Sequence, residues 1–93
     1  LMSITFRYTS QLAGAAGKSG EIVEAKAGAD LLVLLGDLSE KHGYEFAKFV
    51  VDAEGEAVAT LVVAVNGVQV SLDDPVALGE GDEVMLITPM SGG

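Results

Sequence analysis

The two final glycines, Gly92 and Gly93, present the group with the clearest chemical potential, which is the carboxylate of Gly93. Glycine lacks a Cβ atom, so a Gly-Gly end is thin and flexible, and backbone donors inside a narrow channel could bind its carboxylate. A free carboxylate is a poor electrophile because it is anionic and has no good leaving group. Transfer of AMP from ATP would give a mixed anhydride, from which a sulfur or nitrogen nucleophile could displace AMP. We therefore expect this protein to supply the reactive group and a partner to supply the catalysis.

Other reactive groups are scarce in the chain. There is no cysteine, which excludes disulfides, thiolate metal sites, a cysteine nucleophile and iron–sulfur clusters. His42 is the single histidine, and a contact with a helix end explains it better than metal binding or catalysis. Ser91 has no base near it in the sequence, so we do not expect a serine nucleophile. We predict no metal site and no stably bound cofactor.

Acidic residues dominate the charge. The chain has 14 acidic and 5 basic residues, for a net charge of −9. Such a surface repels phosphate backbones, so we expect no nucleic-acid partner. It suits a basic protein partner, or it serves solubility alone, and the sequence leaves both interpretations open. The acidic pairs 73–74 and 82–83 are interpreted as solvated turn carboxylates in preference to a weak cation site.

The size and hydropathy of the chain predict one domain, residues 1–93, in the cytoplasm. Its 93 residues suit a single small core, to which the 49% hydrophobic residues can contribute. No apolar run approaches the roughly 18 residues of a membrane span, and the first residues lack a signal-peptide pattern. We therefore expect no membrane contact.

Hydrophobic periodicity predicts the secondary structure of the first half. Residues 2–8 alternate as a half-buried strand, residues 9–20 indicate a loop or a frayed turn, and residues 21–27 indicate a short second strand. The next apolar residues recur with the period of a helix and predict one. Asp30 is the expected cap of this helix, Gly43 its expected end, and Asp37 and Lys41 an expected ion pair. The apolar positions that carry these patterns are Met2, Ile4, Phe6 and Tyr8 in the strand, and Leu31, Leu34, Leu35 and Leu38 in the helix.

The second half predicts three further strands. Phe46 and Phe49 are expected to anchor a short turn on the core, and an exposed loop follows. Asn66-Gly67 lies between two β-rich runs and predicts a hairpin. The last strand places Val84, Leu86 and Thr88 on one face and Met85 and Ile87 on the other. A single main helix covers only one face of a sheet, so Met85 and Ile87 predict a docking surface, unless a loop covers them.

Residues 64–93 resemble the C-terminal third of the ubiquitin-like sulfur carriers, and among them are most similar to the small subunit of molybdopterin synthase. The matching features are "VNG", "DDP", "GDEV", an apolar strand that ends in Pro89, and the terminal Gly-Gly. Residues 6–14 and 28–43 resemble the first strand and the helix of that family, whereas residues 44–59 match nothing specific. The chain has Thr88 where a proline often precedes Pro89.

This resemblance implies an α+β, β-grasp fold: a mixed sheet of about five strands crossed by one main helix, with adjacent, parallel first and last strands. It also implies that an ATP-dependent activating enzyme adenylates Gly93, which then becomes a thiocarboxylate. Residues 90–93 would form an extended tail, with Gly92 threading the large subunit of a heterotetrameric molybdopterin synthase. The residues expected to contact partners are Arg7, Met85, Ile87, Pro89, Met90 and Ser91.

Other functions remain open on the same residues. Sulfur could go to thiamine thiazole or to another acceptor. Alternatively, a lysine amine could attack activated Gly93, which would make the protein a ubiquitin-like modifier. A plain binding module, in which the Gly-Gly end has no role, is the remaining hypothesis. In each case the protein is a carrier or binding partner, and not a complete enzyme on its own.

Overall fold

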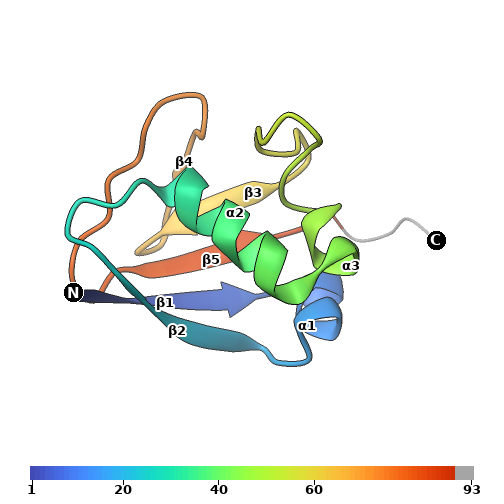
Figure 1. Ribbon diagram of the computed structural model, residues 1–93, viewed down its shortest axis with the longest axis horizontal. Coiled ribbons are helices and arrows are strands. Elements are labelled where there is room, and N and C mark those ends of the chain that lie inside the picture. The colour runs from blue at the N-terminus through green and yellow to red at the C-terminus, as the bar shows by residue number, and fades with distance from the viewer. Residues whose placement is uncertain (90–93) are drawn as a thin grey trace.

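The computed structural model of the protein describes residues 1–89. Along this part of the chain lie β1 (Met2–Tyr8), α1 (Ser10–Ala16), β2 (Gly20–Ala25), α2 (Leu31–His42), α3 (Tyr44–Ala47), β3 (Val62–Val65), β4 (Val68–Val70) and β5 (Glu83–Ile87). The strands form one mixed sheet in the order β2-β1-β5-β3-β4, in which only the β1–β5 pair is parallel among the described strands. Figure 1 shows α2 lying across one face of the sheet, with α1 and α3 near one end. The predicted α+β, β-grasp architecture is confirmed.

The hydrophobic core lies between α2 and the covered face of the sheet. The alternating residues of β1 and the predicted stripe of α2 all point into it, and Val84 and Leu86 add the contribution of β5. A two-residue period in the strand and a 3.6-residue period in the helix bury one face of each element, which is why the sequence predicts this core correctly. Its fully buried side chains include Ile4, Phe6, Leu12, Leu31, Leu35, Phe46, Val50, Val84 and Leu86.

The prediction of a loop across residues 9–20 is wrong, because Ser10–Ala16 forms α1. Its side chains are mostly small, and Leu12 alone is fully buried there, so no helical stripe is visible in the sequence. Alanine favours the helical backbone, and Leu12 anchors the turn to the core. Gly17 then ends α1 with a φ of 74°, a conformation that glycine adopts without strain.

Asp30 is the N-cap residue of α2, as predicted, but the contacts of Asp30 and Lys41 differ from those expected. Asp30 occupies the N-cap position, but its side chain accepts a hydrogen bond from the Val76 N–H at 2.9 Å instead of capping the helix. Leu31 N–H also donates to the Val76 carbonyl, so the start of α2 is tied to the loop before β5. Lys41 pairs with Glu21 on β2 and not with Asp37, because the packing of α2 on the sheet brings this partner within 2.5 Å.

The predicted hairpin is confirmed between β3 and β4. Asn66 and Gly67 both have positive φ angles, 52° and 82°, as a tight two-residue hairpin turn requires. The Asn66 side chain also donates to Asp82 at 2.9 Å and accepts from the Glu83 N–H at 2.9 Å. These two bonds fix the turn to the beginning of β5.

The segment between α2 and β3 follows the sequence prediction in outline. Phe46 is fully buried, Phe49 packs against the core, and residues 52–56 are exposed. Among the helices of residues 1–89, none has the length and apolar character needed to cross a membrane.

Candidate functional site

Thr9, the residue immediately after β1, holds the start of the segment that follows β5. The Thr9 hydroxyl donates to the Leu86 carbonyl at 3.1 Å and accepts from the Thr88 N–H at 3.4 Å. Thr9 N–H also donates to the Leu86 carbonyl. The side chain of Thr9 thus continues the β1–β5 pairing by one position beyond the strands. Thr88 is buried at this point, and Pro89 is exposed directly after it.

Replacing Thr9 with valine keeps the shape of the side chain but removes both hydroxyl bonds. We predict a loss of about 1 kcal/mol of unfolding free energy and faster hydrogen exchange at the Thr88 amide. Hydrogen–deuterium exchange followed by NMR measures both effects. Thr9→Ser retains the hydroxyl and should restore slow exchange. An unchanged hydrogen-exchange rate at the Thr88 amide of the valine variant would show that Thr9 does not hold the segment after β5.

The outer face of β5 carries the predicted docking residues. Val84, Leu86 and Thr88 are buried, whereas Met85 and Ile87 lie half-buried on the opposite face, as the alternation predicted. Arg7 pairs in register with Met85 on this face, and its Nε lies 2.8 Å from a Glu83 oxygen. Apolar side chains next to a charged edge are typical of interface surfaces.

Neighbouring strands extend this outer face. Ile22 on β2 is 68% exposed and lies opposite Thr5, while Ala64 and Val62 on β3 lie opposite Met85 and Ile87. We call the set Arg7, Ile22, Val62, Ala64, Met85 and Ile87 the outer-face patch. The same strand, β5, therefore contributes the patch and leads directly to Pro89. The remaining predicted site residues, Met90, Ser91, Gly92 and Gly93, lie outside the described residues.

Sequence reasoning missed a buried polar cluster around Glu21. The Glu21 carboxylate lies 2.5 Å from the Tyr8 hydroxyl, 2.5 Å from Lys41 Nζ and 2.6 Å from His42 Nε2. The side chains of Glu21 and His42 are both more than nine-tenths buried. The rings of Tyr8 and His42 also pack against Phe46. His42 does lie at the helix end, as predicted, but its contact is a carboxylate on β2, which no local pattern reveals.

The contacts of Glu21 determine its ionisation. Burial alone would raise the pKa of Glu21, but hydrogen bonds from Lys41, Tyr8 and His42 outweigh burial and lower this pKa from 4.5 to about 2. Burial and the bond to Glu21 raise the pKa of Tyr8, so its hydroxyl stays protonated and donates. The cluster therefore fastens the end of α2 to β1 and β2 through an ionised carboxylate.

Replacing Glu21 with glutamine should reduce the unfolding free energy at neutral pH by about 1–3 kcal/mol, because charge-assisted bonds are lost in a buried site. Because the folded pKa lies below the unfolded value, the stabilisation is present above about pH 4.5 and disappears as the pH falls toward 2. Denaturant unfolding across this range should show the two proteins converging at low pH. Glu45→Gln, at an exposed ion pair with Lys48, is the control and should change stability little. A constant difference between Glu21→Gln and the parent at every pH would contradict this assignment.

The described residues contain no group of three or more His, Cys, Asp or Glu side chains that could hold a metal ion. The Asp82 carboxylate instead accepts from the Gly79 N–H at 2.8 Å and from the Asn66 side chain, and these bonds lower its pKa. It is a turn-stabilising residue.

A mixed five-stranded sheet in the order β2-β1-β5-β3-β4, with α2 lying across one face (Figure 1), defines a ubiquitin-like, β-grasp domain. The model of the ThiS family matches residues 6–93, and the chain belongs to this family of ubiquitin-like sulfur carriers. Among curated protein sequences, none matches the chain.

Solved structures support the same fold. SAMP1 from Haloferax volcanii is 28% identical, with a TM-score of 0.80 and coverage of 98% of this chain and 99% of that one. A protein from Pyrococcus furiosus, assigned as subunit 1 of a molybdopterin converting factor, is 27% identical, with a TM-score of 0.73 and coverage of 97% and 100%. The Amycolatopsis orientalis BexX/CysO complex contains a chain that is 23% identical, with a TM-score of 0.71 and coverage of 97% and 99%. That last likeness concerns the fold alone.

Proposed function

We propose that this protein carries sulfur as a thiocarboxylate on Gly93 and donates it in molybdopterin synthesis. The observation that carries the proposal is the arrangement of β5, which presents Met85 and Ile87 on the outer face and leads through Thr88 and Pro89 to the diglycine sequence. Membership of the ThiS family and the likeness to the Pyrococcus furiosus protein support this function.

The chemistry requires two partners. An activating enzyme would use ATP to transfer AMP to the Gly93 carboxylate, with release of pyrophosphate. Hydrosulfide would then attack the carbonyl carbon, form a C–S bond and displace AMP, which leaves a thiocarboxylate. The large subunit of a molybdopterin synthase would bind the end of the chain and direct this sulfur to a cyclic pyranopterin precursor. ATP thus acts in the activating enzyme.

The residues of this chain would position the reactive end. The outer-face patch would bind the large subunit while Pro89, Met90 and Ser91 lead into its channel. Gly92 would pass through the narrowest part, because a residue without a side chain needs the least room. Thr9 would fix the direction in which this segment leaves the domain, through its bonds to Leu86 and Thr88.

A second candidate function is protein modification, favoured by the likeness to SAMP1 at 28% identity. The same adenylate at Gly93 would then be attacked by a lysine amine, with formation of an isopeptide bond and release of AMP. The two functions share their activation step and differ in the nucleophile.

Reconstitution distinguishes these functions. The protein carrying a Gly93 thiocarboxylate is mixed with a molybdopterin synthase large subunit and the pyranopterin precursor, and the product and consumed thiocarboxylate are quantified. The sulfur-carrier proposal predicts one thiocarboxylate consumed for each sulfur transferred. Absence of sulfur transfer, together with isopeptide conjugates in the cell, would favour the modifier.

A further inference from the structure

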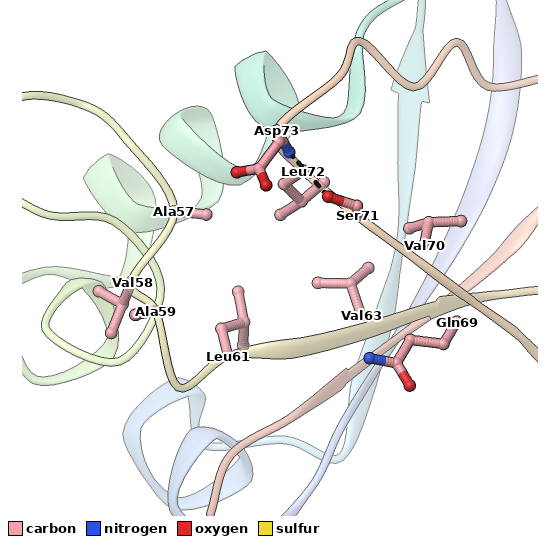
Figure 2. A pocket seen from close by; sticks show the side chains of 10 residues that line it. All are labelled: Ala57, Val58, Ala59, Leu61, Val63, Gln69, Val70, Ser71, Leu72 and Asp73. Atoms are coloured by element: carbon pink, nitrogen blue, oxygen red, sulfur yellow. Dashed lines mark hydrogen bonds between the residues drawn. The ribbon is translucent and has the colours of Figure 1, made fainter.

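A groove lies beside β4, at the edge of the sheet farthest from β2. Its volume is about 550 Å³, and Figure 2 shows the surrounding side chains. Residues 57–59 form one wall and residues 71–73 the other, with the β3–β4 hairpin between them. The residues that make it apolar are Val58, Leu61, Val63, Val70 and Leu72. It shares no residue with the outer-face patch.

The backbone of Gln69 adds a strand edge to this groove. In a two-residue hairpin the pair that flanks the turn, Val65 and Val68, exchanges backbone hydrogen bonds, so the next pair, Ala64 and Gln69, does not. β4 is the edge strand of the described sheet, and the Gln69 N–H and C=O therefore point away from β3. An edge of this kind can pair with an extended segment of another protein.

The charged residues of the chain segments that form the groove are all acidic. Residues 49–93 contain eight acidic residues and no lysine, arginine or histidine. The loop that leads into the first wall contains Glu54 and Glu56, and the second wall ends at Asp73, beside Asp74. All four are exposed, and within residues 1–89 none of the four forms an ion pair. We call these four side chains the acidic rim.

We propose that this groove binds an extended segment of a partner protein in which apolar residues alternate with lysine or arginine. In an extended segment, successive side chains point to opposite faces, so its apolar residues would enter the groove while its basic residues meet the acidic rim. One residue of the segment would pair with the Gln69 backbone. The charge of the rim disfavours acidic peptides and nucleic acids. This site is independent of Gly93 and of the proposed sulfur chemistry.

The probe is a synthetic peptide that alternates lysine and valine over about seven residues, a usual strand length. Two control peptides have the same length: one replaces lysine with glutamate, and the other groups the same residues into a lysine block and a valine block. Titration of isotope-labelled protein is followed by amide chemical shifts. We expect saturable shifts at Val63, Gln69, Val70 and Leu72 with the alternating peptide, weaker binding of the block peptide and none of the glutamate peptide.

Paired variants separate the contributions of charge and backbone. Asp73→Lys with Asp74→Lys should weaken binding about tenfold, because the net charge of the four acidic side chains beside the groove changes from −4 to zero. Asp37→Lys with Glu40→Lys makes the same change in net charge on the exposed side of α2 and should have less than about a twofold effect. Gln69→Pro removes the outward N–H and should weaken binding more than Gln69→Ala, which keeps that N–H and loses only the side chain.

Substitutions that fill the groove test directly where the peptide binds, and they leave every charge unchanged. Ala59→Trp places a large side chain at the wall, and Ala53→Trp places it in the exposed neighbouring loop. The first should abolish binding and the second should not. Circular dichroism of each variant verifies folding, and if Ala59→Trp fails to fold, Ala57→Leu at the same wall takes its place. The proposal is overturned if the alternating peptide does not bind, if its shifts map to the outer-face patch, or if both lysine pairs weaken binding equally.

Discussion

Deletion of Gly93, or addition of one residue after it, is expected to reduce adenylation and thiocarboxylate formation to the background measured without the protein. Both changes move the reacting carboxylate away from the position at which the activating enzyme must bind it, and chemistry depends on placing reacting atoms within a fraction of an ångström. Neither change touches the described fold, so the melting temperature should stay the same. Pyrophosphate release and intact mass measure the two steps.

A one-residue extension before Leu1 is the matched control, because it changes chain length at the other end and should react normally. Gly92→Val adds a β-branched side chain beside the reacting group and should fold normally but lose sulfur transfer. Thiocarboxylation of the extended chain without its prior cleavage would refute the role of Gly93.

Ile87→Asp should weaken association with the large synthase subunit by about ten- to a hundredfold while changing the melting temperature little. Ile87 is half-buried on the outer face, opposite Val62 and beside Met85, so it would become an apolar anchor at the centre of the interface. Truncating such an anchor costs about 1–3 kcal/mol, and burying an unpaired charge there adds to this loss. Calorimetric titration with the purified large subunit measures the change.

Val33→Asp makes the same substitution on the exposed side of α2, where Val33 is 61% exposed, and should leave association unchanged. Increasing salt should slow association of the parent protein, because screening weakens the steering of an acidic domain toward a basic partner. If Ile87→Asp unfolds the domain, or binds as tightly as Val33→Asp, the outer-face patch is not the docking surface.

The parts of the fold that were predictable from sequence are those with a local signal. Alternation identified β1, the leucine stripe identified α2, and Asn66-Gly67 identified the hairpin turn. Alternation also assigned Val84 and Leu86 to the core and Met85 to the other face. In the strands and in α2 a repeating pattern determines which side chains are buried, and in the hairpin two adjacent residues determine the backbone conformation of the turn.

The parts that were not predictable depend on contacts between distant segments. α1 has a single buried residue, Leu12, so its sequence shows no repeating apolar pattern from which a helix could be predicted. The Asp30 side chain accepts a hydrogen bond from Val76, 46 residues away, and not from the first turn of its own helix. Glu21 meets Lys41 and His42 only because α2 packs over β2. Polar side chains with several possible partners are assigned by tertiary packing, which a single sequence does not reveal.

The groove beside β4 also combines features that the sequence reveals with contacts that depend on the fold. The hairpin turn was visible in the sequence, but the approach of residues 57–59 to residues 71–73 was not. The acidic excess was visible in the sequence, but which acidic side chains lie beside the apolar groove depends on the fold.

The most direct test of the central claim is the intact mass of the protein purified from its native host under non-reducing, thiol-free conditions, with fragmentation that locates any modification. The sulfur-carrier account predicts a population in which sulfur replaces one oxygen of the Gly93 carboxylate, and loss of that population when the activating enzyme is absent. A chain that always carries an unmodified carboxylate at Gly93, or whose Gly93 is joined to lysine amines of other proteins without any thiocarboxylate form, would contradict it.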